Sequence, residues 1–303
     1  ELRPHALLEV AKVINANPGM KLIYSDEGII DATGKPLFSN FKPDWNPELL
    51  LGQNYICHLS VFDRRLVMQL NGLRKGFEGA QDWDLNLRFT ELTESKDIFH
   101  IPKILYFWRS IKGSTALNIF EKNDIFKVSL KTIKETTKRR KINAKTEFIF
   151  NDLNYLRIKI INKSNPKVSI IIPIKDRINL LKSLISSLFN TISYKNYEII
   201  IVDNNSVENE TKVYLKKIIQ NNQIKIIRFV GEFNYSKINN LAVMKAKGDI
   251  LLLLNNDVEA IELGWFEEML SHAVKPEIGC VGAKLFYTDK NGDRKTKIDH
   301  VRV

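Results

Sequence analysis

Residues 168–177 carry the sequence Val-Ser-Ile-Ile-Ile-Pro-Ile-Lys-Asp-Arg, and this stretch decides the class of the fold. Its continuous run of apolar, largely β-branched residues predicts a strand buried on both faces of a sheet. Helical apolar spacing follows, and strand and helix patterns then alternate along the chain. We predict strands at 168–172, 197–202, 224–229 and 250–254, and helices at 178–189, 213–219 and 237–246. This alternation favours right-handed crossovers and a doubly wound, mostly parallel α/β sheet.

Polar residues follow three of these predicted strands: Lys175 and Asp176, Asp203, and the tripeptide 255–257, Asn-Asn-Asp. Ligands of open α/β sheets bind beyond the carboxyl ends of the strands, where these side chains should lie. The chain has no glycine-rich dinucleotide fingerprint and no Walker A loop, so a phosphate ligand would need another source of positive charge. A divalent cation held by Asp257, with Asn255 as a neutral oxygen donor, would supply it. The alternative is that these residues only form turns at strand ends.

Four segments of this region resemble, in the same order, motifs of family 2 glycosyltransferases. They are 168–177, 197–206 (Tyr-Glu-Ile-Ile-Ile-Val-Asp-Asn-Asn-Ser), 233–249 and 250–257. The resemblance implies a GT-A fold, with 166–303 as the nucleotide-sugar-binding half of a domain. It further implies that Pro173, Asp176, Asp203, Asn240 and Asn255 contact the donor sugar nucleotide, and that Asp257 holds Mn²⁺ or Mg²⁺ on the diphosphate. Asn255 stands where the usual DXD motif has its first acidic residue.

Residues 1–118 resemble the other half of the same family, an α+β half that binds the acceptor. The segments that carry this resemblance are 22–27, 41–47, 76–85 and 100–109. It implies that Asp82 is the catalytic base, because an inverting transfer needs a carboxylate to remove the acceptor's proton. The alternative is that Asp82 and Asp84 only open a helix, where acidic residues are favourable. Some relatives have a histidine at the position of Phe107 that could bind the metal, whereas this chain has phenylalanine there. We expect His100 to have a structural role.

Between these halves, residues 119–165 form a basic segment that we interpret as a connector. From 119 to 167 the chain has 13 Lys or Arg and 5 Asp or Glu, a net charge of +8, centred on the run 138–141. Apolar residues at 126, 130 and 133 predict a helix, and a hairpin is expected with strands near 146–150 and 155–161. The first interpretation of the charge is a solvated helix face; the alternative is contact with an anionic membrane surface or acceptor. Nucleic acid is not an expected partner.

The order of the halves is the reverse of that in a single GT-A domain. We therefore predict that the chain spans the end of one transferase domain (1–118), a connector (119–165) and the start of a second domain (166–303). Asp82 and Asp257 would then belong to two different active sites, and the chain alone is expected to be inactive. The alternative is that the two halves dock on each other and form one permuted site.

Composition supports a globular chain, with 44% hydrophobic and 27% charged residues among 303. Its longest apolar stretches are much shorter than the roughly 20 residues of a membrane span, and no signal peptide is evident. Cys57 and Cys280 are predicted to be buried free thiols, consistent with a cytoplasmic location, at the inner face of the membrane if the basic segment binds lipid. The expected function is inverting, metal-dependent transfer from a nucleotide-diphosphate sugar to a glycan or lipid-linked glycan in bacterial surface polysaccharide synthesis. The competing class is a non-catalytic sugar-nucleotide-binding, glycan-binding or scaffold domain.

Overall fold

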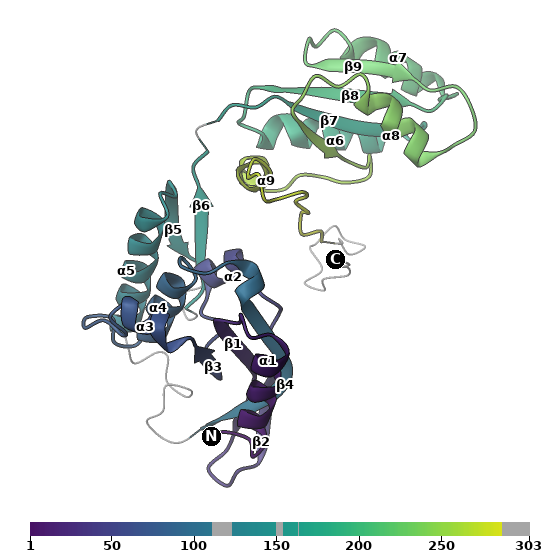
Figure 1. Cartoon of the computed structure of the whole chain (residues 1–303). Helices are drawn as coiled ribbons and strands as arrows, with labels where there is room; N and C mark the ends of the chain where they lie inside the picture. The colour runs from purple at the N-terminus through teal and green to yellow at the C-terminus, as the bar shows by residue number, and fades with distance from the viewer. Residues whose placement is uncertain (111–122, 150–153, 163, 287–303) are drawn as a thin grey trace. The chain divides into compact units, whose positions relative to one another are not determined.

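The computed structural model describes residues 1–110, 123–149, 154–162 and 164–286. The chain divides into two compact units, residues 1–159 and 160–303 (Figure 1). No helix among the described residues is long and apolar enough to cross a membrane.

The second unit is built on a parallel sheet. Its strands are β7 (Val168–Ile174), β8 (Tyr197–Asp203), β9 (Ile224–Arg228) and β10 (Ile250–Leu253). Their order across the sheet is β10-β7-β8-β9, and every pair is parallel. Strands β7 to β9 follow one another outward, whereas β10 returns to the free edge of β7. The direction of winding therefore reverses between β7 and β10, and the predicted mostly parallel α/β sheet is confirmed.

Helices cover both faces of this sheet (Figure 1). They are α6 (Ile178–Thr191), α7 (Asn209–Ile218), α8 (Tyr235–Val243) and α9 (Trp265–Ala273). Ile170 and Ile172 pack into one cluster with side chains of α6, α7 and α9, whereas Ile171 packs into another with side chains of α8. All three isoleucines are fully buried, and burial of such a side chain stabilises a fold by roughly 1.5–3 kcal/mol. The isoleucines of β7 thus pack against both helical layers, one on each face of the sheet.

The predicted elements of this unit all form, with shifts at their ends. The helix predicted at 213–219 begins earlier, at Asn209, and the helix predicted at 237–246 spans Tyr235–Val243. The side chain of Asn234 accepts a hydrogen bond from Lys237 N at 2.9 Å, which fixes the start of α8. Helix α8 thus ends before the predicted residue 246, and Gly248 approaches β7 beyond this end.

The first unit contains a four-stranded mixed sheet. Its strands are β1 (Leu22–Ile30), β2 (Pro36–Asn40), β3 (Ser60–Phe62) and β4 (Ile98–Arg109). Strand β1 pairs antiparallel with β2 and β3 and parallel with β4. The helices are α1 (Ala6–Ala16), α2 (Pro47–Gly52), α3 (Arg64–Gln69), α4 (Gln81–Phe89) and a 3₁₀ turn at Ser95–Asp97. This arrangement has the α+β class predicted for residues 1–118.

The helix and hairpin predicted for the basic segment also form. They are α5 (Asn123–Arg139), β5 (Ala144–Phe148) and β6 (Leu156–Ile160), and the two strands pair with each other. The predicted strand residue at 150 lies outside the described residues. Ile133 of α5 and Leu156 of β6 are buried in the same cluster as Trp83 and Leu87 of α4. The segment interpreted as a connector is therefore part of the core of the first unit up to residue 159.

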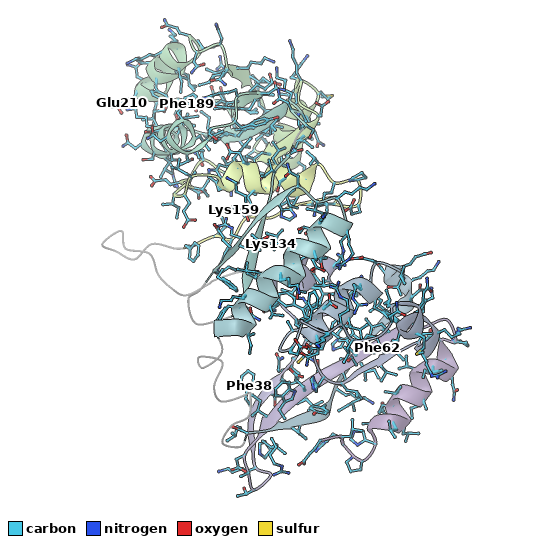
Figure 2. All side chains as sticks on the ribbon, turned by 90° about the vertical axis from the view of Figure 1, so that its left-hand side faces the viewer. Phe38, Phe62, Lys134, Lys159, Phe189 and Glu210 are labelled. Atoms are coloured by element: carbon cyan, nitrogen blue, oxygen red, sulfur yellow. The ribbon has the colours of Figure 1, made fainter. Side chains whose placement is uncertain are left out.

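The basic run of α5 is partly neutralised by this packing. Arg139 and Arg140 both form ion pairs with Glu91, at 2.9 and 3.3 Å. Burial lowers the pKa of Arg140, and the Glu91 carboxylate opposes that effect. Lys134 of α5, labelled in Figure 2, is exposed. The predicted solvated basic face thus consists of lysines, while the two arginines dock the helix.

Gly248 provides a test of the contact between the loop after α8 and the sheet. A Cβ added there would lie 2.5 Å from the backbone nitrogen of Ser169, and Gly248 N donates to Ser169 Oγ at 2.9 Å. We expect Gly248→Ala to lower the free energy of unfolding by about 1–3 kcal/mol, the usual effect of overpacking. Gly279→Ala, where nothing lies within 4 Å, is the control and should change it little. Urea denaturation measures both, and equal stability of the two variants would contradict the prediction.

Candidate functional site

The loops after β7 and β8 are joined through Asp176. Its Oδ1 accepts hydrogen bonds from the backbone nitrogens of Val207 and Glu208, both at 2.9 Å. Its own backbone nitrogen donates a hydrogen bond to Ser206 Oγ at 2.9 Å. Asp176 has a φ of 53°, in the left-handed region that few residues with a side chain adopt. The hydrogen bonds on both sides of the residue stabilise that backbone conformation.

Asp203 has a related role at the end of β8. Its Oδ1 accepts from Ser206 N at 2.9 Å, and β7 pairs with β8 so that Ile174 lies opposite Asp203 and Pro173 opposite Val202. The side chains of Pro173, Asp176 and Asp203 are all partly exposed. The two carboxylates therefore stabilise the tip of the sheet and still face its surface.

Asn255 and Asp257 follow β10 at the same edge of the sheet. The hydrogen bond from Leu254 N to Ile171 O, 2.9 Å long, continues the pairing of β10 with β7 to this point. Asn255 and Asp257 are exposed, and the intervening Asn256 is partly exposed. Carboxylate and amide oxygens suit a hard divalent cation. Asn240, also predicted to contact the donor, is exposed on α8.

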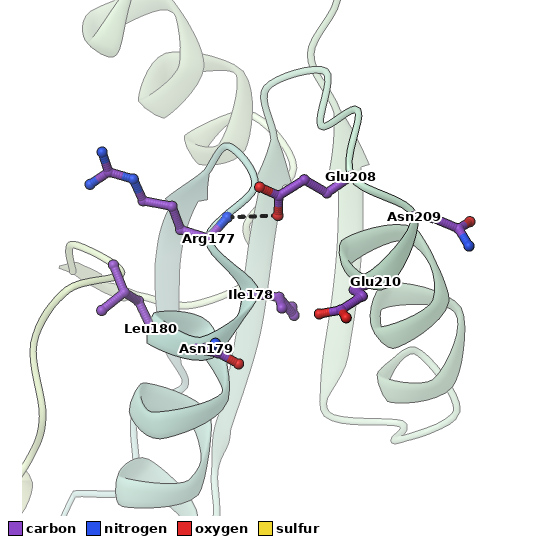
Figure 3. Close-up of a pocket in the computed structure, with 7 residues that line it drawn as sticks. All are labelled: Arg177, Ile178, Asn179, Leu180, Glu208, Asn209 and Glu210. Carbon is purple, nitrogen blue, oxygen red and sulfur yellow. Dashed lines mark hydrogen bonds between the residues drawn. The ribbon is translucent and has the colours of Figure 1, made fainter.

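A cavity of about 560 Å³ lies beside these loops, where α6 and α7 begin (Figure 3). Its lining residues are Arg177, Ile178, Asn179, Leu180, Glu208, Asn209 and Glu210. The Glu208 carboxylate accepts a hydrogen bond from Arg177 N at 3.2 Å. None of the predicted donor-binding residues lines it, and two carboxylates make it a poor receptor for a diphosphate. The residues predicted to contact the donor therefore lie at the sheet edge and outside this cavity.

In the first unit, Asp82 lies in the first turn of α4 and is partly exposed. Asn54 Nδ2 donates to Asp82 Oδ2 at 2.8 Å, and Asn86 Nδ2 donates to Asn54 Oδ1 at 3.1 Å. Asn54, which stands just after α2, thus connects two residues that are one helical turn apart. These contacts fix the direction of the Asp82 carboxylate.

Asp84 has a different environment, although it is only two residues away. Its side chain is fully buried and forms ion pairs with Arg74 and Arg88, the latter at 2.9 Å. Arg88 also donates to the carbonyls of Leu70 and Gly72. Asp84 therefore organises the core beside α4. Asp84 therefore does more than open the helix, which was the alternative for both aspartates. Asp84 forms buried ion pairs, whereas Asp82 is partly exposed and accepts a hydrogen bond from Asn54.

A polar cluster next to Asp82 contains Glu27, Lys42, Cys57 and His58. Suitable ligand atoms of Glu27, Cys57 and His58 all lie within 4.8 Å of one another. The buried Lys42 ammonium donates to the carbonyls of Ile56 and His58 and lies 3.4 Å from Glu27 Oε2. Lys42 thereby holds the loop of Cys57 and His58 over the Glu27 carboxylate.

The charges of this cluster affect the pKa values of Cys57 and His58. Burial raises the pKa of the Cys57 thiol, and the Glu27 and Asp82 carboxylates raise it further. Burial lowers the pKa of His58, while the same two carboxylates oppose that effect. Both side chains are therefore neutral at neutral pH. Asp82 acts electrostatically on both residues, so this loop belongs to the surroundings of the candidate base.

Both cysteines are free, as predicted, but their burial was predicted wrongly. Cys57 is partly exposed and Cys280 is exposed. Cys57 stands in the polar loop over Glu27, and Cys280 stands in the chain after α9, where no element covers it in the described structure. Apolar neighbours in the sequence did not indicate these positions, because burial depends on what packs against the loop.

His100 has the structural place expected of it. Its Nε2 lies 2.9 Å from Asp26 Oδ1 and its Nδ1 lies 3.0 Å from Asp44 Oδ1, and its ring stacks on Tyr24. Phe107 packs over Gly28, where a Cβ would lie 2.6 Å from the phenyl ring. Phe107 thus fills space beside β1.

Sequence reasoning did not single out Asn54, Lys42 or His58 as site residues. Asn54 is separated from Asp82 by 28 residues, and Lys42 from His58 by 16. The sequence signal for this group was weak: the adjacent pair of Cys57 and His58, and a lysine in an aromatic and proline-rich segment. Only the folded loop brings them to the same place.

Comparison with known proteins gives this geometry a context. Residues 169–302 match the family model for glycosyl transferase family 2. The uncharacterized protein y4gI of Sinorhizobium fredii is 40% identical over 290 residues, 95% of this chain and 32% of that protein. The O-antigen biosynthesis protein RfbC of Myxococcus xanthus is 38% identical over 288 residues, 95% of this chain and 22% of that protein. The chain thus spans about a third or less of the length of these two relatives.

Among solved structures, a similar one is the mannosyltransferase PcManGT of Pyrobaculum calidifontis in complex with GDP-Man and Mn²⁺. The TM-score is 0.36 at 16% identity, and the match covers 40% of this chain and 37% of that chain.

The different environments of Asp82 and Asp84 give a matched pair of substitutions. Asp84→Asn removes the buried anion from between Arg74 and Arg88, and although Arg74 keeps Glu135 at 2.9 Å, we expect a loss of about 3–5 kcal/mol in the free energy of unfolding. Asp82→Asn removes a partly exposed charge bonded to one amide and should cost less than about 1 kcal/mol. Urea unfolding followed by tryptophan fluorescence compares the two. A loss for Asp82→Asn as large as that for Asp84→Asn would refute the separation of roles.

Proposed function

We propose, on the premise that this chain belongs to glycosyl transferase family 2 through residues 169–302, that it takes part in moving a sugar from a nucleotide-diphosphate sugar to a glycan acceptor. The observation that carries the proposal is the position of Asp257, at the carboxyl end of β10, where the sheet reverses its direction of winding. Such a reversal is the usual place for a nucleotide ligand.

On the donor side, we propose that Asp257 holds a divalent cation, with Asn255 as a second oxygen donor. Both side chains are exposed just after the end of β10, which leaves their oxygens accessible to a hard ion that also binds phosphate oxygens. When bound, Mn²⁺ or Mg²⁺ would stabilise the charge that develops on the departing diphosphate. Asp176 and Asp203, at the tips of β7 and β8, are proposed to face the nucleoside. Pro173 and Asn240 would complete the donor surface.

On the acceptor side, we propose that Asp82 is the general base of an inverting transfer. Its carboxylate is partly exposed, and Asn54 fixes its direction with a hydrogen bond of 2.8 Å. A positioned carboxylate of this kind removes the proton from an acceptor hydroxyl as that oxygen attacks the donor sugar. Asp84 supports this role, because its buried ion pairs hold α4 in place.

We further propose that Asp82 and Asp257 serve two different active sites of a tandem protein. The two compact units, with their boundary near residue 159, support this division. Among the residues that the structure describes, β10 is an edge strand, and its Leu251 and Leu253 are 42% and 51% exposed. A sheet edge with such side chains is normally paired or covered, which supports a completed domain in a longer protein. The chain by itself is then inactive in transfer.

For the acceptor, we propose a glycan or lipid-linked glycan in the synthesis of a bacterial surface polysaccharide. The similarity to the O-antigen biosynthesis protein of Myxococcus xanthus supports this class. The exposed lysines of α5, such as Lys134 and Lys138, are where an anionic membrane surface or acceptor would bind, because Arg139 and Arg140 already pair with Glu91. The reaction would then take place in the cytoplasm, at the inner face of the membrane.

A second candidate function is a non-catalytic domain that binds a sugar nucleotide or a glycan. Two observations favour it: Asn255 stands in place of an acidic residue, and Phe107 packs against Gly28. Binding without turnover in a longer protein that contains this chain would be its signature.

The role of Asp257 is tested by donor binding in a full-length protein that contains this chain. A panel of sugar nucleotides is titrated with and without Mn²⁺, in the wild type and in Asp257→Ala. We expect Asp257→Ala to weaken metal-dependent binding by at least about 10- to 100-fold, because even the loss of a group that only supports a metal ligand costs that much. Glu259→Ala, exposed two residues later, is the control and should bind like the wild type. Metal-independent binding, or equal binding by Asp257→Ala, would overturn the metal role.

The role of Asp82 is tested by turnover in the same protein. We expect Asp82→Asn to lower kcat for the transfer by about 10²–10⁴-fold, the usual contribution of a general base, while donor binding stays unchanged. Glu78→Gln, on the exposed loop before α4, should keep wild-type kcat. A kcat close to wild type in Asp82→Asn would assign the base to another residue.

A further inference from the structure

We propose that Glu27, Cys57 and His58 form a binding site for a borderline-soft divalent cation such as Zn²⁺. This site is in the first unit and is distinct from the metal position proposed at Asp257. Carboxylate, thiol and imidazole are three of the ligand types that zinc takes in proteins. Here the three ligand atoms lie within 4.8 Å of one another.

The spacing of the two strongest ligands fits a zinc ion. Cys57 Sγ lies 3.3 Å from His58 Nδ1. Zinc bonds of about 2.3 Å to sulfur and 2.0 Å to nitrogen, at a tetrahedral angle, place these atoms about 3.5 Å apart. An ion would therefore replace the proton between sulfur and nitrogen with a shift of a few tenths of an ångström. The Glu27 carboxylate closes a third position, and the fourth is left for water.

The loop that carries two of the ligands is held in place before any ion binds. Lys42 donates to the carbonyls of Ile56 and His58, and His58 N donates to Glu27 Oε2 at 3.2 Å. These bonds tie the loop to β1, which carries Glu27. A site that is already assembled loses little conformational entropy when the ion enters.

The backbone at Cys57 is a second, independent observation. Its φ is 36°, a left-handed conformation that glycine adopts freely and that costs a residue with a Cβ of the order of 1 kcal/mol. A cysteine in this position places its sulfur beside the His58 ring, whereas a glycine would provide no second ligand next to the imidazole. Strained residues of this kind gather at functional sites.

The surroundings of His58 favour coordination as well. Its ring centroid lies 4.8 Å from those of Tyr106 and Trp108, so two aromatic side chains fix the direction of the imidazole. All three ligand residues are partly exposed, which leaves a path for the ion. Rigid, partly apolar walls around a ligand strengthen a metal site.

The ligand types decide which kind of ion the site takes, because the Lys42 ammonium, 3.4 Å from Glu27 Oε2, repels all divalent cations there alike. A hard ion such as Mg²⁺ would gain little beyond this one carboxylate, because it prefers oxygen ligands. Zn²⁺ gains a thiolate and an imidazole in addition, and its charge deprotonates the coordinating thiol. Binding therefore releases one proton, from Cys57, for each ion bound.

The test uses the whole 303-residue chain, stripped of metal with a chelator and titrated with Co²⁺. We expect a thiolate-to-cobalt charge-transfer band that saturates at one ion per chain, and that Zn²⁺ displaces. Zinc titration in weakly buffered solution should release one proton per ion. Mg²⁺ in excess should leave the cobalt band unchanged. Absence of the charge-transfer band in the wild type would overturn the site.

Three variants assign the band to its ligands. Cys57→Gly suits the backbone conformation at this position, so it should fold and lose the band. Glu27→Gln should keep the band but weaken cobalt binding at least about tenfold, as loss of a supporting group does. Cys280→Ser removes the other, exposed thiol and should bind like the wild type. Loss of the band in Cys280→Ser with its retention in Cys57→Gly would show adventitious binding and refute the proposal.

Circular dichroism of each variant shows whether it has folded. The outcome does not depend on the proposed transfer, because the readout is the absorption of a thiolate–cobalt bond and not turnover. Failure of the site would leave the proposed transfer standing, and failure of the transfer would leave the site standing.

Discussion

The pairing of β7 with β8 on one side and β10 on the other is the constraint on which the second unit depends. Ile170, Ile171 and Ile172 have no exposed surface, because helices cover both faces of β7. A strand buried in this way must pair on both edges to satisfy its backbone groups. Since both of its neighbours are parallel, the carboxyl ends of the strands meet at one edge. The polar residues that end each strand are gathered there as a result.

That gathering involves a compromise between stability and binding. Asp176 and Asp203 each accept backbone hydrogen bonds from the loop at 203–208, so the carboxylates that are proposed to face a nucleoside also hold their own loops together. The Asp257 side chain, in contrast, is exposed just after the end of β10. Its carboxylate suits the metal role proposed for it, because hard divalent cations take carboxylate ligands.

In the first unit, structural stabilisation and the proposed catalytic role fall on two different aspartates, one buried and one partly exposed. Asp84 is fully buried between Arg74 and Arg88, and it fixes α4. Asp82, two residues earlier, faces the other way, toward Asn54. The charge of Asp82 acts on Cys57 and His58, which share one loop. Lys42 fixes this loop by donating hydrogen bonds to the carbonyl oxygens of Ile56 and His58. The carboxylate of Glu27, the thiol of Cys57, the imidazole of His58 and the ammonium of Lys42 are thus concentrated beside the Asp82 carboxylate.

The sequence by itself determined the parallel α/β sheet, the helix and hairpin of the basic segment, and the sheet edge where Asp176, Asp203 and Asp257 lie. It did so because apolar periodicity and strand-end polarity are local signals. It missed the ends of α8, where the Asn234 cap and the close approach of Gly248 to Ser169 decide the boundary. It also missed the docking of α5 on α4, the exposure of Cys280, and the group of Glu27, Lys42, Cys57 and His58. Those depend on contacts between residues far apart in the chain, and only the tertiary structure decides which distant side chains share one small volume.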